Sequence, residues 1–158
     1  MRKKYSISDK VMLSFMTIMI MITFFGVNYE MPIASNNSDE EWHFVLSVDS
    51  TSQSYIAARD KLDYSKIYFN WGSVTAGNLS AIEVEPYGVR GGKYVPVGTS
   101  KGGHKIYAIY NTGKYSITNW ALELSCSRAS VGLNSYQGSG LAKGVWSPDS
   151  VGLYTILQ

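Results

Sequence analysis

The sequence predicts an all-β domain, a single antiparallel β-sandwich, preceded by a helical amino-terminal export signal. Three observations support this prediction. An uncharged apolar stretch follows a basic amino terminus, hydrophobic residues alternate with period two over much of the remaining chain, and glycine-rich turns separate these short runs. A small barrel is the alternative architecture, because eight or nine short strands without a helix after the leader suit either fold.

The amino-terminal end has the charge order of a secretory signal. Four basic residues among the first ten precede seventeen uncharged residues, 11–27, and Pro32 then breaks the helix. Ala34 supplies the small residue that a signal peptidase requires, so we expect cleavage after it and a secreted, extracellular product. An uncleaved leader that anchors the protein in the membrane is the alternative, because seventeen residues lie at the lower edge of the ~17–25 that span a bilayer.

The composition changes at this boundary. All six methionines lie before it, whereas all four tryptophans and ten of the twelve tyrosines lie after it. The chain therefore divides into a signal peptide, residues 1–34, a flexible polar lead-in, residues 35–41, and a β-sandwich domain, residues 42–158. The exported part has ten basic and ten acidic residues and is neutral. We expect no nucleic-acid partner, contact with a membrane only through the leader during export, and a monomer.

The strands are predicted from alternation and from the turns between them. Pro96 indicates an edge strand or the end of a strand, because proline cannot donate to a ladder. A change of parity near Thr118 predicts a bulge within one long strand. The predicted strands are 42–48, 52–61, 66–71 ended by Gly72, 79–85 closed by Pro86, 93–97, 104–110, 115–128, 141–146 and 151–157, with hairpins at Asn111–Lys114 and Ser147–Ser150.

No catalytic or metal-binding motif stands out. Cys126 paired with His43 or His104 would give a thiol nucleophile and its base, but Cys126 shares the parity of Leu122 and Leu124 and is predicted to point into the core. The two histidines lack neighbours at ligand spacing, so we expect neither a metal nor a cofactor. The domain is therefore predicted to be non-enzymatic.

Glu83 and Glu85 are two residues apart on one predicted strand and so lie on the same face, about 7 Å from each other. That separation overlaps the range of catalytic carboxylate pairs in glycosidases, but such pairs must flank a bond inside a cleft. Two carboxylates on the same strand, next to Pro86, cannot flank a bond from opposite sides. A solvated face is the prediction for both carboxylates.

Aromatic residues are the most distinctive feature of the exported part, which has four Trp, ten Tyr and two Phe. Strand-borne aromatic side chains that the core does not need can stack on sugar rings or peptides, or pair with another protein. Tyr68, Tyr107 and Tyr110 are the candidate binding residues. The alternative is that these aromatics fill the core and cover the sheets.

Two stretches carry a resemblance to a known group of proteins. Ala58–Tyr68 and Gly144–Val151 resemble segments of an uncharacterised family of small secreted proteins of Gram-positive bacteria, some of whose relatives are bacteriocin-like and similar to the lactococcin-type family. The matching residues are Arg59, Lys61, Asp63, Trp146, Ser147, Pro148, Asp149 and Ser150. The closing motif also suits a tight last hairpin, and the charges of 59–63 suit a surface network.

These observations favour a secreted, non-enzymatic protein that binds a component of the cell envelope, or another protein, on its own or a neighbouring cell. Two alternatives are open. One is a bacteriocin-like secreted toxin, and the other is a secreted hydrolase whose site would bring His104, Cys126 and a carboxylate within hydrogen-bonding reach.

Overall fold

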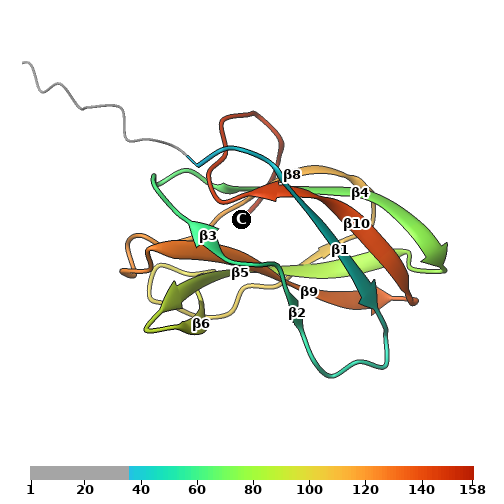
Figure 1. The fold of residues 1–158 in the computed structure, drawn as a ribbon. Helices are drawn as coiled ribbons and strands as arrows, with labels where there is room; N and C mark the ends of the chain where they lie inside the picture. The colour runs from blue at the N-terminus through green and yellow to red at the C-terminus, as the bar shows by residue number, and fades with distance from the viewer. Residues whose placement is uncertain (1–35) are drawn as a thin grey trace, which may run out of the picture. The chain divides into compact units, whose positions relative to one another are not determined.

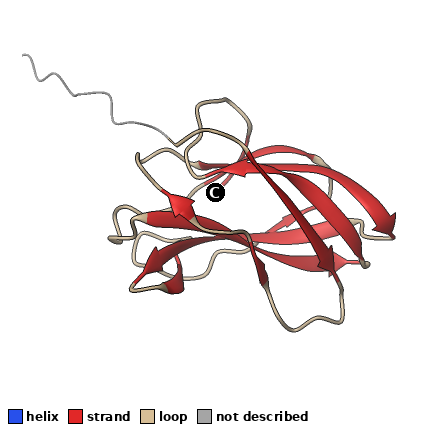
Figure 2. Cartoon of the chain, viewed as in Figure 1, coloured by secondary structure: helices blue, strands red, loops and turns tan. Residues whose placement is uncertain are grey.

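The computed structural model describes residues 36–158, and this part of the chain is an all-β sandwich without helices (Figures 1 and 2). The predicted signal peptide and its cleavage site after Ala34 lie outside the described residues. Over residues 36–158, no helix has the length and apolar character needed to cross a membrane. The strands are β1 (Glu40–Leu46), β2 (Ser54–Tyr55), β3 (Arg59–Asp60), β4 (Ile67–Gly77), β5 (Ala81–Arg90), β6 (Lys93–Pro96), β7 (Tyr107–Ile109), β8 (Gly113–Ile117), β9 (Arg128–Gln137), β10 (Gly140–Ser147) and β11 (Thr155–Leu157).

The strands form two sheets that pack face to face as the layers of the sandwich (Figure 1). Sheet A has the order β1-β10-β4-β8-β11, and sheet B has the order β2-β9-β5-β6, with β3 also on β9 and β7 also on β5. The prediction of a sandwich is confirmed. One pair departs from the predicted antiparallel arrangement, because β11 runs parallel to β8.

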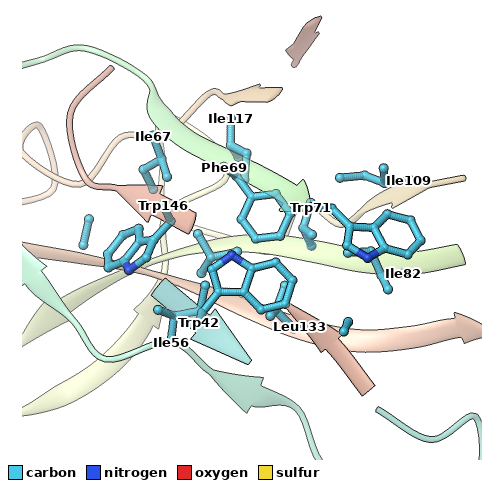
Figure 3. Packing of buried hydrophobic residues seen from close by; sticks show 14 of the residues in the cluster. Trp42, Ile56, Ile67, Phe69, Trp71, Ile82, Ile109, Ile117, Leu133 and Trp146 are labelled. Carbon is cyan, nitrogen blue, oxygen red and sulfur yellow. The ribbon is translucent and has the colours of Figure 1, made fainter. Parts of the chain in front are cut away.

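The core lies between the sheets and consists mainly of aromatic and branched residues (Figure 3). Trp42 and Phe69 stack with their ring centroids 5.1 Å apart. Trp71 and Trp146 are almost completely buried beside them. The period-two alternation of 42–46 and 67–71 therefore places one set of side chains inside, as predicted.

Pro86 does not end its strand, as the sequence suggested, but lies in the middle of β5. Strand residues direct N–H and C=O to the same neighbour, and the carbonyl oxygen of Pro86 accepts from Val97 N at 3.1 Å. The missing donor of Pro86 therefore faces Val97 as well. Val97 O is satisfied by Trp120 N at 2.9 Å, so the proline leaves no carbonyl without a donor.

The predicted hairpin around Asn111–Lys114 is wrong. The segment crosses instead from β7 in sheet B to β8 in sheet A, since β7 pairs with β5 and β8 pairs with β4. The long strand expected over 115–128 is also interrupted, because residues 121–125 form turns in which Cys126 N donates to Ala121 O at 2.8 Å. The parity change near Thr118 thus marks the end of a strand and not a bulge.

The predicted last hairpin at Ser147–Ser150 is absent from the described residues, because β10 pairs with β1 and β4 while β11 pairs with β8. Strand β1 begins at Glu40, two residues before the predicted start. The polar segment before it is attached to the domain. Arg59 donates to Asn36 Oδ1 at 2.8 Å and to Ser38 O at 2.7 Å.

Candidate functional site

The outer face of sheet B carries a buried carboxylate beneath aromatic side chains. Ile82 and Val84 of β5 belong to the core between the sheets, so Glu85 and Tyr87, which alternate with them, lie on the opposite face. Glu85 is only 2% exposed. The prediction that Glu85 is solvated is wrong, because neighbouring side chains cover this face of the strand.

Three side chains hold the Glu85 carboxylate. Tyr87 donates its hydroxyl hydrogen to Oε2 at 2.7 Å, and Gln53 Nε2 donates to the same oxygen at 3.4 Å. His104 Nδ1 lies 2.7 Å from Oε1. Because an ionised carboxylate only accepts hydrogen bonds, Nδ1 carries the hydrogen, which leaves Nε2 of this mostly exposed ring to face other partners. These contacts compensate for burying the charge.

The strand environment keeps Tyr87 in its donor form. Burial, together with the hydrogen bond to Glu85, raises the pKa of Tyr87 well above its ordinary value of 10.0. The ring has room because Gly132 of β9 lies below it. A Cβ at Gly132 would be 2.5 Å from Gln53 Cδ and 2.8 Å from Tyr87 Cε2. Glycine at this position therefore admits both side chains to the sheet surface.

Two half-exposed tyrosines extend this cluster outward. Tyr55 of β2 lies edge-on to Tyr87, with ring centroids 5.0 Å apart, and stacks on Tyr94 of β6 at 4.7 Å. Tyr55 is 36% exposed and Tyr94 is 41% exposed. We call Gln53, Tyr55, Glu85, Tyr87, Tyr94 and His104 the tyrosine platform. It presents flat aromatic surface beside hydrogen-bonding groups, a combination typical of ligand sites.

The three tyrosines predicted as binding residues lie elsewhere. Tyr68 is buried, which raises its pKa, and its ring lies 4.8 Å from that of Tyr154. Tyr107 packs half-buried against the core. Tyr110 is exposed and meets Tyr136 edge-on at 5.7 Å. Of the three, only Tyr110 presents a large exposed surface.

Cys126 points into the core, as predicted, and is 1% exposed. Burial raises the pKa of its thiol, although Arg90 acts in the opposite direction. The hydrolase alternative required that His104, Cys126 and a carboxylate lie within hydrogen-bonding reach of one another. The structure pairs His104 with Glu85, whereas the Cys126 thiol faces Leu124 O at 3.7 Å, so only the histidine and the carboxylate meet.

The two stretches that carried the resemblance meet in space. Lys61 Nζ lies 2.6 Å from Asp149 Oδ1, and the two side chains are 1% and 0% exposed. The predicted surface charge network is therefore wrong for Lys61, although Arg59 does pair with Glu40 at 3.1 Å. Of the other motif residues, Trp146, Ser147 and Pro148 are buried, and Asp63 and Ser150 are partly exposed.

A concavity on sheet A has a volume of about 640 Å³. Residues of β1, β4 and β10 line it, including Glu41, His43, Asn70 and Lys143. It lacks the exposed aromatic surface of the tyrosine platform. Among residues 36–158, no three His, Cys, Asp or Glu side chains come together as metal ligands.

Sequence reasoning missed the tyrosine platform for identifiable reasons. Tyr55 lies in the predicted strand 52–61 and Tyr94 in the predicted strand 93–97, but alternation does not show which strands lie side by side. One signal was present, since Glu85 and Tyr87 share a parity on a single strand, but only the pairing of β9 beside β5 shows what covers them.

The fold and the site define an all-β sandwich whose outer face carries stacked tyrosines over a buried carboxylate. The chain belongs to the family described as "Protein of unknown function (DUF2712)", whose model matches residues 31–150. The resemblance to an uncharacterised family is thereby confirmed. Comparisons with curated proteins and with solved structures gave no significant match.

Proposed function

We propose that this protein is secreted, has no enzymatic activity and binds glycan of the cell envelope, on its own or a neighbouring cell, through the tyrosine platform. The observation that carries this proposal is the half-exposed stacked pair Tyr55 and Tyr94, whose ring centroids lie 4.7 Å apart, beside Tyr87, which donates to the buried Glu85. The amino-terminal charge pattern and apolar stretch support export.

The platform suits a neutral, ring-shaped ligand. Aromatic faces contact apolar C–H surface, and neighbouring polar groups fix the orientation of the ligand. Exposed His104 Nε2 and the two tyrosine hydroxyls supply donors and acceptors at the rim. The exported part carries ten basic and ten acidic residues, which provides no bulk electrostatic attraction for a polyanion.

The direct test is sedimentation of the purified protein with isolated cell walls and with their released polysaccharide. We expect wild type to co-sediment, and Tyr94→Ala and Tyr55→Ala each to weaken binding by at least about tenfold, since stacked aromatic contacts dominate such sites. Two controls should bind as wild type. Tyr64→Ala removes an exposed tyrosine outside the platform, and His43→Ala alters the concavity on sheet A.

Failure of wild type to bind any wall fraction would exclude the proposal. If His43→Ala and Tyr94→Ala weakened wall binding equally, the binding site would not be the tyrosine platform. Killing of intact cells by the protein, without wall binding, would favour the bacteriocin-like alternative.

A hydrolase is the second candidate, and the pair His104 and Glu85 favours it. A carboxylate that holds Nδ1 of an exposed histidine is the arrangement that orients a general base. Release of soluble sugar or peptide from cell walls by wild type, abolished in His104→Ala, would establish it. Binding without release would favour the non-enzymatic proposal.

A further inference from the structure

Lys61 and Asp149 form an unusually close and deeply buried pair of oppositely charged side chains. From their buried 2.6 Å contact we propose that the two side chains condense after folding into an intramolecular isopeptide bond between Nζ of Lys61 and Cγ of Asp149. The bond would close a loop between residues that are 88 positions apart and would join the segment after β3 of sheet B to the segment after β10 of sheet A.

The first step in the argument is proximity. The Lys61 Nζ atom lies 2.6 Å from Asp149 Oδ1. A carbon–oxygen bond of about 1.2–1.3 Å then puts Cγ within about 3.9 Å of Nζ, close to the ~3–3.5 Å of a near-attack geometry. Both side chains are at most 1% exposed, so bulk water does not compete with the amine for the carbonyl carbon.

The second step is stabilisation of the developing charge. Asp149 Oδ2 accepts the backbone N–H of Asn36 at 2.6 Å and that of Leu62 at 3.2 Å. When the amine attacks Cγ, negative charge accumulates on this oxygen. Two fixed backbone donors in a buried site are the elements of an oxyanion hole.

The third step is the movement of protons. Transfer of one proton from Nζ to Oδ1 across their contact gives a neutral amine and a carboxylic acid, the forms that react. Asp63 Oδ1 lies 3.5 Å from Nζ. Its carboxylate takes a second proton from the attacking nitrogen and returns it to Oδ1, which leaves as water. The N–Cγ bond forms, the Cγ–Oδ1 bond breaks, and no oxidant, reductant or co-reactant is required.

The surrounding contacts hold the amine in this position. Lys61 Nζ also donates to Ser65 O at 2.7 Å, and the same oxygen accepts from Asn119 Nδ2 at 3.2 Å. Ser65 N in turn donates to Asp63 Oδ1 at 2.8 Å, which orients that carboxylate toward the amine. The lysine therefore has few alternative positions. Folding alone brings the amine and the carboxyl group into the geometry that the reaction needs.

Peptide mass spectrometry of the purified full chain tests the proposal. Trypsin cannot cut after an acylated Lys61, so we expect a branched peptide that joins residues 60–66 to residues 144–158 and is lighter than the sum of the two by one water. Lys61→Arg should yield only linear peptides. Asp63→Asn should slow formation of the bond by about 10²–10⁴-fold, the usual contribution of general acid–base catalysis.

Asp60→Asn is the matched control, because this neighbouring carboxylate is 71% exposed and should leave the yield of the branched peptide unchanged. Recovery of the unmodified peptides alone from folded wild-type protein would overturn the proposal, whatever the variants do. An undiminished rate in Asp63→Asn, with the bond present, would overturn the role of Asp63.

Discussion

Tyr87 donates its phenolic hydrogen to the carboxylate of Glu85 at 2.7 Å, from two positions further along the same strand. The pair lies on the outer face of a sheet, yet Glu85 is 2% exposed and Tyr87 is 5% exposed. A charged acceptor in such a place requires its donors, because an uncompensated buried carboxylate costs several kcal/mol. The tyrosine platform is therefore a structural unit as well as a candidate binding surface.

Tyr87→Phe should lower the free energy of unfolding by about 1.5–3 kcal/mol, the range for a hydrogen bond to a charged group. The change keeps the ring and removes only the donor to Glu85. Urea unfolding followed by tryptophan fluorescence measures the effect. Tyr64→Phe, at a tyrosine that is 68% exposed, is the control and should be neutral. Equal stability of the two variants would contradict a role for this hydrogen bond.

The sequence was sufficient for the fold class because the alternation is clear where one face of a strand is buried. The alternation holds in β1, where Trp42 and Leu46 are buried, and in β4, where Phe69 and Trp71 are buried. It was insufficient for β9, the strand between β2 and β5, which was not predicted at all. Within this strand, residues 129–133, ASVGL, are buried on both faces, so they show no alternation of apolar and polar residues.

The buried polar groups were predicted least well. Lys61, Glu85 and Asp149 are charged residues, and charged residues are mostly exposed, so a solvated surface was the reasonable expectation. Lys61 and Asp149 are buried because they pair across 88 positions, whereas Glu85 is held by His104, 19 positions away, and by Tyr87 of its own strand. The distant pairings are properties of the tertiary structure and have no local sequence signal.

Breaking the pair of Lys61 and Asp149 should be costly. Asp149→Ala leaves the lysine amine buried without its counter-charge, and we expect a loss of about 3–5 kcal/mol in the free energy of unfolding from this cause, to which the loss of the proposed isopeptide bond adds. The double variant Lys61→Met/Asp149→Leu also lacks the proposed bond, but it should be more stable than Asp149→Ala because apolar side chains of similar volume need no partner. Denaturant unfolding measures both.

Asp60→Asn provides the comparison for that experiment. Its carboxylate is 71% exposed and lies 3.7 Å from Arg128 Nε, so the change should cost less than about 1 kcal/mol. A double variant that is less stable than Asp149→Ala would contradict the prediction, because it would show that burying the unpaired lysine amine carries no penalty.

The fold should lose stability in alkaline solution. Burial raises the pKa of Tyr68, Tyr87, Tyr107 and Tyr115 above the ordinary value of 10.0. Below about pH 10 both folded and unfolded chains keep these protons, and the stability is fully present. Above it the unfolded chain releases them first, so the free energy of unfolding falls as the pH rises through the folded-state values.

Urea midpoints between about pH 8 and pH 11 check this dependence. Tyr87→Phe should show a shallower decline than wild type, because phenylalanine has no proton to lose. The comparison is between slopes, since the variant begins from a lower stability. A wild-type midpoint that rises with pH across this range would contradict the prediction.

Cys126 should be unreactive in the folded protein. Burial raises the pKa of this thiol above its ordinary value of 9.0, and the side chain is 1% exposed, so neither thiolate nor access is available to a reagent. We expect iodoacetamide at about pH 8 to leave the native protein unmodified and to label it fully in denaturant. Because the sequence has a single cysteine, mass spectrometry reads this site alone. Rapid labelling under native conditions would show that the turn at 121–125 opens, which would expose the adjoining core to solvent.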